Sequence, residues 1–390
     1  MDSNLFVLKK KILLITSKFP YSEKEADGGL STVSAVITSL KNDYDLDILF
    51  VRTPNDKEKT IDGVKNIFFE EIRHKSSNKF ERRLNNYNQV SSRIIKMADN
   101  YDCIIIIHAS KAFGLEKASE KVLNKAVLYP MFLSFAYKES GENVPQKYFD
   151  LERKCFQSIR WIICPSTYDK NTIIEHYGDK NKAFFVIPRS VSSYISHANR
   201  HRTNKNRLLC IGNIKVRKQP LTLLRIFTKI RMSLPNATLT FAGEIQDKDI
   251  YKSCLKYIAE NHLGTAVSFL GAVNQEQIGN LIKSSDINVC TSNLETFGRC
   301  VFEGMFGGLP TVIFDKLTCV GEFVKNGEGI FFVQDENEFC ERVVQLLQND
   351  EMYNKQSIRA IESTDFISSG IESQRLKSVV ERVMGAKNEF

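Results

Sequence analysis

Two glutamates, Glu295 and Glu303, are separated by seven residues in the segment NLETFGRCVFEGMFGGLPT. If a helix begins near Gly298, Glu295 lies in the loop just before it, and Glu303 lies a little over one turn inside, on the face toward that loop. The first backbone N–H groups of a helix have no partner within it, so they form a favourable phosphate site, and glycine lets a ligand approach closely. A carboxylate on each side of such a site suits a phosphate ligand with hydroxyls at both ends.

Other residues that could bind a ligand or take part in chemistry lie in the loops that follow apolar runs. Lys218 stands with Lys215 and Arg217 in the basic loop KVRKQP, where it could meet a phosphate. His108 follows the run IIII, and Gly28 and Gly29 lie in the loop after the first apolar run. Each feature alone also has a structural interpretation, as an acidic helix start, a solvated basic loop, a hydrogen-bonding histidine or a turn.

The elements that would position these residues form two similar α/β series. In the first half, apolar runs with β-branched residues predict strands, and periodic stretches at 30–40 and 80–97 predict helices. The predicted strands are 11–16, 46–51, 103–108, 126–129, 161–164 and 183–187. From Arg207 the pattern restarts, with strands predicted near 207–211, 238–242, 267–270, 286–290 and 311–314, and helices near 221–232, 251–261, 275–283 and 299–306. The polar segment 190–205 is the predicted linker. This alternation predicts an α/β chain with two doubly wound, Rossmann-like domains that face a central cleft.

Length and composition agree with this class. The chain has 390 residues, with 42% hydrophobic and 26% charged residues and a net charge of +8, which is ordinary for a globular protein and does not call for nucleic acid. No apolar run reaches the ~18 residues that span a bilayer, and the first run is too short for a signal peptide. The nine cysteines contain no C-x-x-C pair, so we expect a reducing, cytoplasmic location.

The run E-T-F-G-x4-E-G-M-x-G-G-L-P resembles the E-x7-E signature of retaining glycosyltransferases of family four, which have the GT-B fold. The runs IGNIKVRKQPLTLLRIF, TLTFAGE, ADGGLSTVSAVITSL and ICPSTYDKNTIIEHYG resemble further segments of that family, so the resemblance covers most of 11–345. It implies an acceptor-side domain over 1–190, joined by a C-terminal helix at about 375–390, and a nucleotide-sugar domain over 191–374.

The resemblance also implies roles for individual residues. Lys218 would contact the donor diphosphate, Glu303 the nucleotide ribose, Glu295 the hydroxyls of the transferred sugar, and His108 the same sugar from the other domain. The catalytic set is therefore Glu295, Lys218 and His108. The donor-binding set is Gly28, Gly29, Asn213, Lys218, Gly243, Gly271, Glu295, Phe297, Gly298, Arg299 and Glu303, with the amides of Phe297, Gly298 and Arg299 on phosphate and the glycines shaping the loops.

Three positions depart from the family's pattern. Asn213 stands where members usually have arginine, so one positive charge is missing, and Lys215 or Arg217 are the candidates to replace it. The usual P-N-G turn is P-R-S over 188–190. Glu244 and Ile245 follow Gly243, where a further glycine is usual. These departures leave the exact donor contacts open.

The implied reaction transfers a sugar from a nucleotide-diphosphate sugar, of which a UDP-sugar is our first expectation, with retention of configuration. Positive charge and helix amides would stabilise the leaving phosphate, so we expect neither a metal nor another cofactor. Asp43, Asp45 and Asp47 match the D-x-D pattern of metal-dependent transferases, but they fall on the polar approach to a strand, which explains them better.

The sequence indicates less about the acceptor than about the donor. We expect a glycan, lipid-linked or small-molecule acceptor, with a role in bacterial surface polysaccharide biosynthesis. Basic residues between Arg73 and Lys96, interleaved with Phe80, Leu84 and 94–95, suggest contact with an anionic membrane at the inner face of the plasma membrane; a solvated basic helix is the alternative.

Several other classes remain open. One is a different GT-B nucleotide-sugar enzyme, such as an epimerase; a phosphorylase would need a pyridoxal-phosphate lysine that the sequence does not show. A second is a non-catalytic nucleotide-sugar-binding protein. A Rossmann dehydrogenase would need G-x-G-x-x-G after the first strand, and only Gly28-Gly29 is present.

Overall fold

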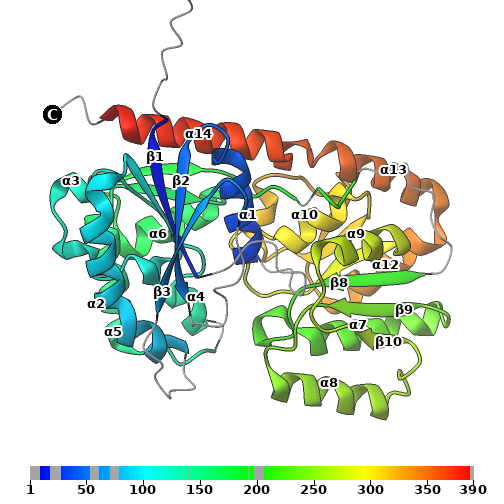
Figure 1. Cartoon of the computed structure of the whole chain (residues 1–390). Coiled ribbons are helices and arrows are strands. Elements are labelled where there is room, and N and C mark those ends of the chain that lie inside the picture. Colours follow the sequence, from blue (N-terminus) through cyan, green and yellow to red (C-terminus); the bar gives the residue numbers. More distant parts are fainter. Residues whose placement is uncertain are drawn as a thin grey trace, which may run out of the picture.

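The computed structural model describes residues 9–17, 28–52, 61–70, 79–139, 141–191, 193–196 and 206–386. Two lobes lie side by side, each built on its own parallel sheet (Figure 1). The first sheet has the order β3-β2-β1-β4-β5-β6-β7. Its strands are β1 (Lys11–Thr16), β2 (Asp45–Arg52), β3 (Lys65–Glu70), β4 (Cys103–Ile107), β5 (Ala126–Tyr129), β6 (Trp161–Cys164) and β7 (Ala183–Val186).

The second sheet has the order β10-β9-β8-β11-β12-β13. Its strands are β8 (Arg207–Ile211), β9 (Thr238–Ala242), β10 (Val267–Phe269), β11 (Ile287–Cys290), β12 (Thr311–Phe314) and β13 (Ile330–Val333). In both sheets the order reverses beside the lobe's first strand, β1 or β8, and every pairing is parallel. Ligand loops gather at the carboxyl ends of strands beside such a reversal. The expected α/β class with two facing parallel sheets is confirmed.

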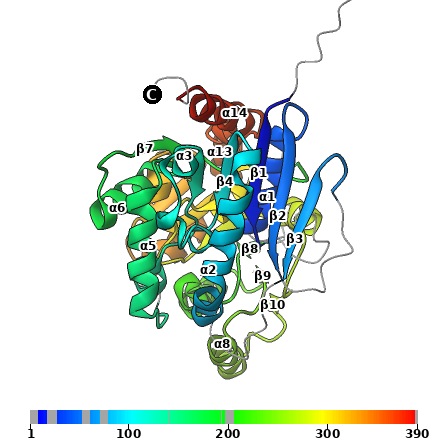
Figure 2. The same cartoon turned by 60° about the vertical axis from the view of Figure 1, so that its left-hand side comes forward.

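Helices cover both faces of each sheet, as the two views show (Figure 2). The first-lobe helices are α1 (Gly28–Leu40), α2 (Lys79–Met97), α3 (Glu120–Leu123), α4 (Ser134–Glu139), α5 (Gln146–Ser158) and α6 (Thr167–Tyr177). The second-lobe helices are α7 (Pro220–Ser233), α8 (Lys248–Glu260), α9 (Gln275–Ser284), α10 (Arg299–Phe306), α11 (Thr318–Gly321), α12 (Glu336–Gln348) and α13 (Asp350–Glu362). Because helices cover both faces, the strands are near-continuous apolar runs, and β4 (CIIII) is buried throughout.

The last helix, α14 (Ser369–Gly385), packs on the first lobe although it follows the second in the chain. Figure 1 shows it lying above the first sheet, beside α1, and continuing the line of α13 from the second lobe. Leu376, Val379, Val380 and Val383 are buried in the same core cluster as Ile12 and Leu14 of β1. Burial of these aliphatic side chains holds the end of the chain against the first sheet.

Several element boundaries differ from the expectations. Helix α1 begins at Gly28, not at Leu30, so Gly28 and Gly29 form its first turn rather than a loop. β4 ends at Ile107, because His108 has a φ of 85° and leaves the strand conformation. Several elements have no counterpart among the predicted ones, including β3, β13 and α5. Of the predicted linker 190–205, residues 192 and 197–205 lie outside the described residues.

The apolar side chains of α2 face the core, not the solvent. Phe80 and Ile94 are buried in the first-lobe core, and Leu84 and Ile95 pack against it. The expectation that these side chains would share a membrane surface with the basic residues is therefore wrong. Arg93 and Lys96 remain on the exposed side of the helix, while Arg73 and Lys75 lie outside the described residues.

Within the described ranges, no helix combines the length and the apolar character that crossing a bilayer requires.

Candidate active site

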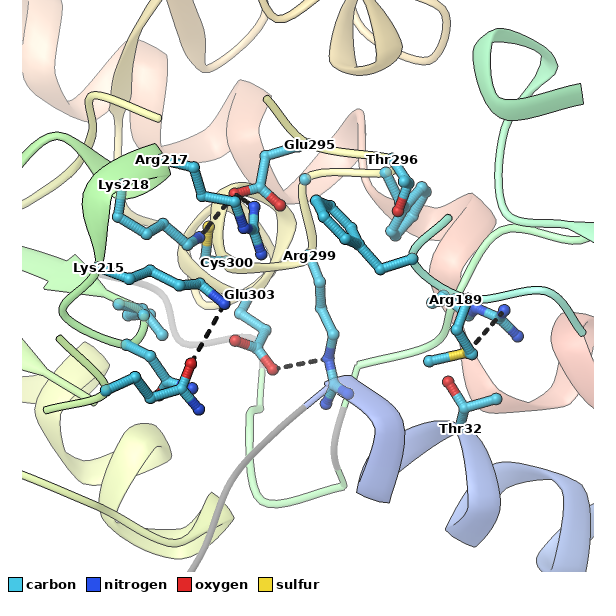
Figure 3. Close-up of a pocket in the computed structure, with 18 of the residues that line it drawn as sticks. Thr32, Arg189, Lys215, Arg217, Lys218, Glu295, Thr296, Arg299, Cys300 and Glu303 are labelled. Atoms are coloured by element: carbon cyan, nitrogen blue, oxygen red, sulfur yellow. Dashed lines mark hydrogen bonds and ion pairs between the residues drawn. The ribbon is translucent and has the colours of Figure 1, made fainter. Parts of the chain in front are cut away.

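A cavity of about 710 Å³ lies between the two lobes, and both of them line it. The first lobe contributes residues that include Thr32, His108 and Phe132, and the second contributes both loops that the sequence analysis singled out, around Lys218 and Glu295. Figure 3 shows Thr32 and Arg189 of the first lobe on one side of this cavity and Lys218 and Glu295 of the second lobe on the other. Each wall is made by loops at the carboxyl ends of strands, where parallel sheets hold their ligands.

Lys218, Arg217 and Glu295 form one compact charged cluster at this cavity. The Lys218 Nζ lies 2.7 Å from Glu295 Oε1, and the Arg217 Nη1 lies 3.0 Å from the same oxygen. The three side chains are only 12%, 15% and 11% exposed. Because a buried ion pair is weakly screened by solvent, the charges of this cluster act strongly on a ligand in the cavity.

The protonation states of the cluster follow from its contacts. Burial would raise the pKa of Glu295, but the charges of Arg217 and Lys218 outweigh that effect and hold the pKa well below its usual range. Burial would lower the pKa of Lys218, but its contacts with Cys300 and Glu295 hold the pKa above its usual range. The carboxylate and the ammonium are therefore both ionised at neutral pH.

Backbone hydrogen bonds hold the basic loop in place. Residues Val216–Lys218 form a 3-10 turn, and Gln219, with a φ of 51°, turns the chain into α7, which starts with Pro220. The backbone N–H of Asn293 donates to Arg217 O at 2.8 Å. The Thr291 hydroxyl donates to the carbonyls of Lys218 and Gln219, each at 3.1 Å. The loop after β11 thus fixes Lys218 beside Glu295.

Helix α10 starts directly after Glu295 and presents its N-terminus to the cavity. Gly298 has a φ of 84°, and a Cβ atom there would lie 2.6 Å from Val320 Cγ2, so the turn requires glycine. Phe297, Gly298 and Arg299 all line the cavity. Glu303, one turn further, is 2.9 Å from Arg299 Nε. The structure thus brings both glutamates and the helix N-terminus together, each glutamate with a basic partner.

Asn213 supports a neighbouring loop rather than the charged cluster. Its Oδ1 accepts a hydrogen bond from the Glu244 N–H at 3.0 Å, although the residue lines the cavity. Lys215 reaches Gln246 Oε1 at 3.3 Å. Of the two candidates for the missing positive charge, it is therefore Arg217 that lies beside Lys218 and Glu295.

Gly243 and Gly271 lie behind the cavity wall. A Cβ atom at residue 243 would lie 2.3 Å from the carbonyl carbon and oxygen of Gly212, so the loops after β8 and β9 touch backbone to backbone. The Gly243 N–H donates to the Gly271 carbonyl at 3.0 Å, and Gly271 has a φ of 71°. The close contact at Gly243 thus holds the loop that carries Asn213 against the loop after β9.

His108 and α1 form part of the first-lobe wall. The Nδ1 of His108 accepts from the Ser110 N–H at 3.2 Å and lies 2.9 Å from the Ser110 hydroxyl, which fixes the ring at the cavity. From α1 it is Thr32 that lines the cavity, one turn after Gly28 and Gly29.

Arg189 and Phe132 line the cavity but were not among the predicted site residues. Arg189 is 8% exposed, lies 4.5 Å above the Tyr129 ring and lines the cavity, so the P-R-S departure brings a buried cation to the site. Asp169 is near enough to interact with it, and burial raises the pKa of this carboxyl to about 7 against the effect of the arginine. Phe132 meets the Arg217 guanidinium at 4.9 Å from across the cavity. The P-R-S motif was a signal for Arg189; no motif marked Phe132.

Contacts between the lobes close one side of the cavity. The Ser166 hydroxyl donates to the Thr296 carbonyl at 2.6 Å. The Thr167 N–H donates to Glu322 Oε2 at 2.7 Å, and the Tyr168 N–H donates to the other oxygen of the same carboxylate. A glutamate of the second lobe therefore binds the N-terminus of α6 in the first, which is favourable for a helix dipole.

The aspartates of the D-x-D pattern lie elsewhere. Asp45 pairs with Lys11 at the start of β1, 3.5 Å away, and Asp47 accepts a hydrogen bond from the Tyr101 hydroxyl at 2.6 Å. Asp43 is paired with Lys377. All three lie at the amino end of β2, whereas the cavity lies at the carboxyl ends of the strands.

Comparison with known proteins relates the second lobe to one family. Residues 193–363 match the family model described as glycosyl transferases group 1. N-acetyl-alpha-D-glucosaminyl L-malate synthase of Bacillus anthracis is 28% identical over 171 residues, which is 43% of this chain and 43% of that protein. The chain thus matches less than half the length of this curated relative.

Solved structures match over the whole fold. Sucrose-phosphate synthase from Thermosynechococcus elongatus superimposes with a TM-score of 0.83 at 14% identity, covering 97% of this chain and all 100% of that one. HepE of Anabaena, in complex with UDP and glucose, superimposes with a TM-score of 0.76 at 15% identity, covering 96% of this chain and 100% of that one. At these identities the likeness establishes the fold. Residues 193–363 thus match the group 1 glycosyl transferase family, and the two lobes together have the GT-B fold.

Proposed function

We propose that this protein is a retaining, metal-independent glycosyltransferase that moves a sugar from a nucleotide-diphosphate sugar, with a UDP-sugar as the first expectation, to a hydroxyl of an acceptor. The observation that carries the proposal is the cluster of Lys218, Arg217 and Glu295 at the N-terminus of α10, inside a cavity between two lobes. Two cations and a helix N-terminus suit a diphosphate, and two carboxylates suit the hydroxyls on either side of it. HepE, a protein of the same fold, has been solved with UDP and glucose, which supports the choice of donor.

In this proposal the charged cluster acts on the leaving group. As the bond from the anomeric carbon to the β-phosphate oxygen breaks, negative charge grows on that phosphate. Lys218, Arg217 and the α10 amides are held in place by the fold, so they stabilise this charge without reorganising. The acceptor hydroxyl forms its bond on the same face of the sugar and passes its proton to the departing phosphate.

The two glutamates then have separate tasks. A diphosphate that shares Lys218 and Arg217 leaves the second oxygen of Glu295 to accept hydrogen bonds from the transferred sugar. Glu303, paired with Arg299, holds the ribose. His108 contacts the sugar from the first lobe, where its ring is fixed by Ser110.

A thermal-shift screen of nucleotide-diphosphate sugars tests this proposal. A ligand at 100 times its Kd stabilises the folded state by about 2.7 kcal/mol, so we expect one donor to raise the melting temperature clearly. We further expect that the same donor releases its nucleoside diphosphate over time and that EDTA leaves the rate unchanged.

The outcomes separate the alternatives. A shift without turnover in the presence of acceptors would favour a nucleotide-sugar-binding protein. Conversion of the donor into a different sugar nucleotide would favour an epimerase. If no nucleotide sugar shifts the melting temperature, the transferase proposal fails.

We also propose that the enzyme works at the cytoplasmic face of the plasma membrane, on a glycan or lipid-linked acceptor of a bacterial surface polysaccharide; a small-molecule acceptor is the other form of the proposal. The exposed Arg93 and Lys96 of α2 would supply electrostatic attraction only, since the apolar side chains are in the core. Flotation with liposomes should therefore show binding that requires anionic lipid and that is lost at high salt. Absence of any dependence on anionic lipid would rule this location out.

A further inference from the structure

Arg83 of α2 is a cation on the first-lobe wall of the cavity, and among the described residues no carboxylate forms an ion pair with it. Burial raises the pKa of the nearby Glu152 carboxyl and outweighs the charge of Arg83, which would lower this pKa. Its Nη1 donates to the Tyr148 hydroxyl at 3.2 Å, and its guanidinium lies 5.9 Å from the centre of the Tyr137 ring. Burial raises the pKa of Tyr148, so that hydroxyl is neutral and gives no counter-charge. Glu142 lines the same cavity, but within this part of the chain no ion pair joins it to Arg83.

Three second-lobe cations at the cavity each form an ion pair with a carboxylate. Lys218 and Arg217 share Glu295, and Arg299 is paired with Glu303. A guanidinium removed from water is costly unless a negative group compensates for it. Arg83 has hydrogen-bond donors and a permanent charge, so an anion in the cavity would compensate for it best.

Two aromatic rings connect Arg83 with the charged cluster. Phe132 lies 4.6 Å from Tyr137, centre to centre, in an edge-to-face arrangement, and Arg217 lies 4.9 Å from the Phe132 ring. Tyr137 in turn neighbours Arg83. All four residues line the cavity, so a continuous wall runs from the carboxylate of Glu295, through Phe132 and Tyr137, to Arg83. The apolar faces of such rings suit the carbon skeleton of a polar ligand.

We propose that Arg83, Tyr137 and Phe132 form an acceptor subsite for a hydroxyl compound that carries a carboxylate or a phosphate. This inference rests on the proposed function and names the class of its acceptor. The acid group binds the guanidinium, whose planar fork suits both kinds of anion. The carbon skeleton lies on the rings, and the hydroxyl that receives the sugar points toward Glu295 and the donor.

Matched sets of small compounds test the subsite by calorimetry on the UDP-bound full chain, independently of turnover. One set is glycerol, glycerate and glycerol 3-phosphate; another is glucose, glucuronate and glucose 6-phosphate. We expect at least one charged member to bind tighter than its neutral partner by about tenfold or more, since one hydrogen-bonded charge pair supplies that much. The carboxylate and phosphate members tell the two acid groups apart.

Variants of α2 then locate the effect. Arg83→Gln should weaken binding of the charged member by about 10- to 100-fold and leave the neutral member unchanged. Arg83→Lys should restore part of the loss. Arg153→Gln is the matched control, because it removes the same charge from the exposed side of α5 in the same lobe. Melting temperatures of the variants show whether each is folded.

In transfer assays with the donor found by thermal shift, Arg83→Gln should raise the KM of the charged acceptor and leave both kcat and donor hydrolysis unchanged. Equal binding of charged and neutral compounds, or a preference that survives Arg83→Gln, overturns the subsite. Donor binding and hydrolysis by the wild type would in that case leave the proposed function standing. If the wild type binds no donor, the proposed function fails, and calorimetry on the full chain without UDP still decides whether Arg83 holds an anion.

Discussion

Replacing Lys218 by methionine should lower the transfer rate at saturating donor by about 10²- to 10³-fold, the usual effect of losing one preorganised group that stabilises developing charge. The ammonium lies 2.7 Å from Glu295 and beside the N-terminus of α10, where the leaving phosphate would sit. Methionine has a similar shape and fits the buried position, but it offers no charge. The measurement is the rate of nucleoside diphosphate release with and without acceptor.

The fold should survive this change, because Glu295 keeps Arg217 as a partner at 3.0 Å and is not left as a lone buried charge. Lys229→Met is the matched control: this lysine lies on α7, directly after the same loop, and its side chain is 42% exposed and faces Glu336. It should retain full activity. A Lys218→Met enzyme within about fivefold of the wild type, far short of the usual loss, would show that the cluster does not act on the leaving group.

Gly243→Ala should destabilise the protein by about 1–3 kcal/mol, as expected for added volume in a tightly packed place. The new Cβ would lie 2.3 Å from the Gly212 carbonyl and 2.7 Å from the Asn213 N atom, and backbone cannot move aside as a side chain can. The displaced loop carries Asn213 and leads to Lys218, so donor affinity should fall as well. Urea unfolding gives the stability change, and a thermal-shift titration with the donor gives the affinity.

Gly264→Ala is the matched control in the same lobe. Nothing lies within 4 Å of a Cβ atom at that position, so alanine should be neutral or stabilise by up to about 1 kcal/mol through the unfolded state. If Gly243→Ala is as stable as Gly264→Ala and binds donor normally, the two loops do not need to touch.

Much of the fold was predictable because apolar runs in a parallel sheet are locally distinctive. The run CIIII and the restart at Arg207 marked β4 and β8, and the predicted strands of both halves match the structure to within one or two residues. The strand β3 was not predicted, since KNIFFE alternates poorly and follows a polar stretch. Helix α1 starts at Gly28, two residues earlier than predicted. The prediction took Gly28-Gly29 for a loop because glycine has a low helix propensity, but tertiary packing can override that preference.

The sequence identified the second-lobe part of the site through one contiguous segment. Glu295, Gly298 and Glu303 occupy one strand–loop–helix unit, so their arrangement follows from helix geometry once α10 starts at Arg299. Lys218 was found as a member of a basic loop, but its contact with Glu295 spans 77 residues of chain and depends on the order of β8 and β11 in the sheet.

By itself, the sequence determined the alternation of strands and helices, the restart that makes two lobes and the segment that pairs a helix N-terminus with two carboxylates. Only the tertiary structure decided which cation joins Lys218, since Lys215 and Arg217 are two residues apart and equal in charge, and the turn at Val216–Lys218 sends Arg217 inward. It also decided that Phe132, Tyr137 and Arg83 form one wall that reaches Glu295. The contact between Arg217 and Phe132 depends on how the two lobes meet, and no local sequence pattern in either lobe specifies how they meet.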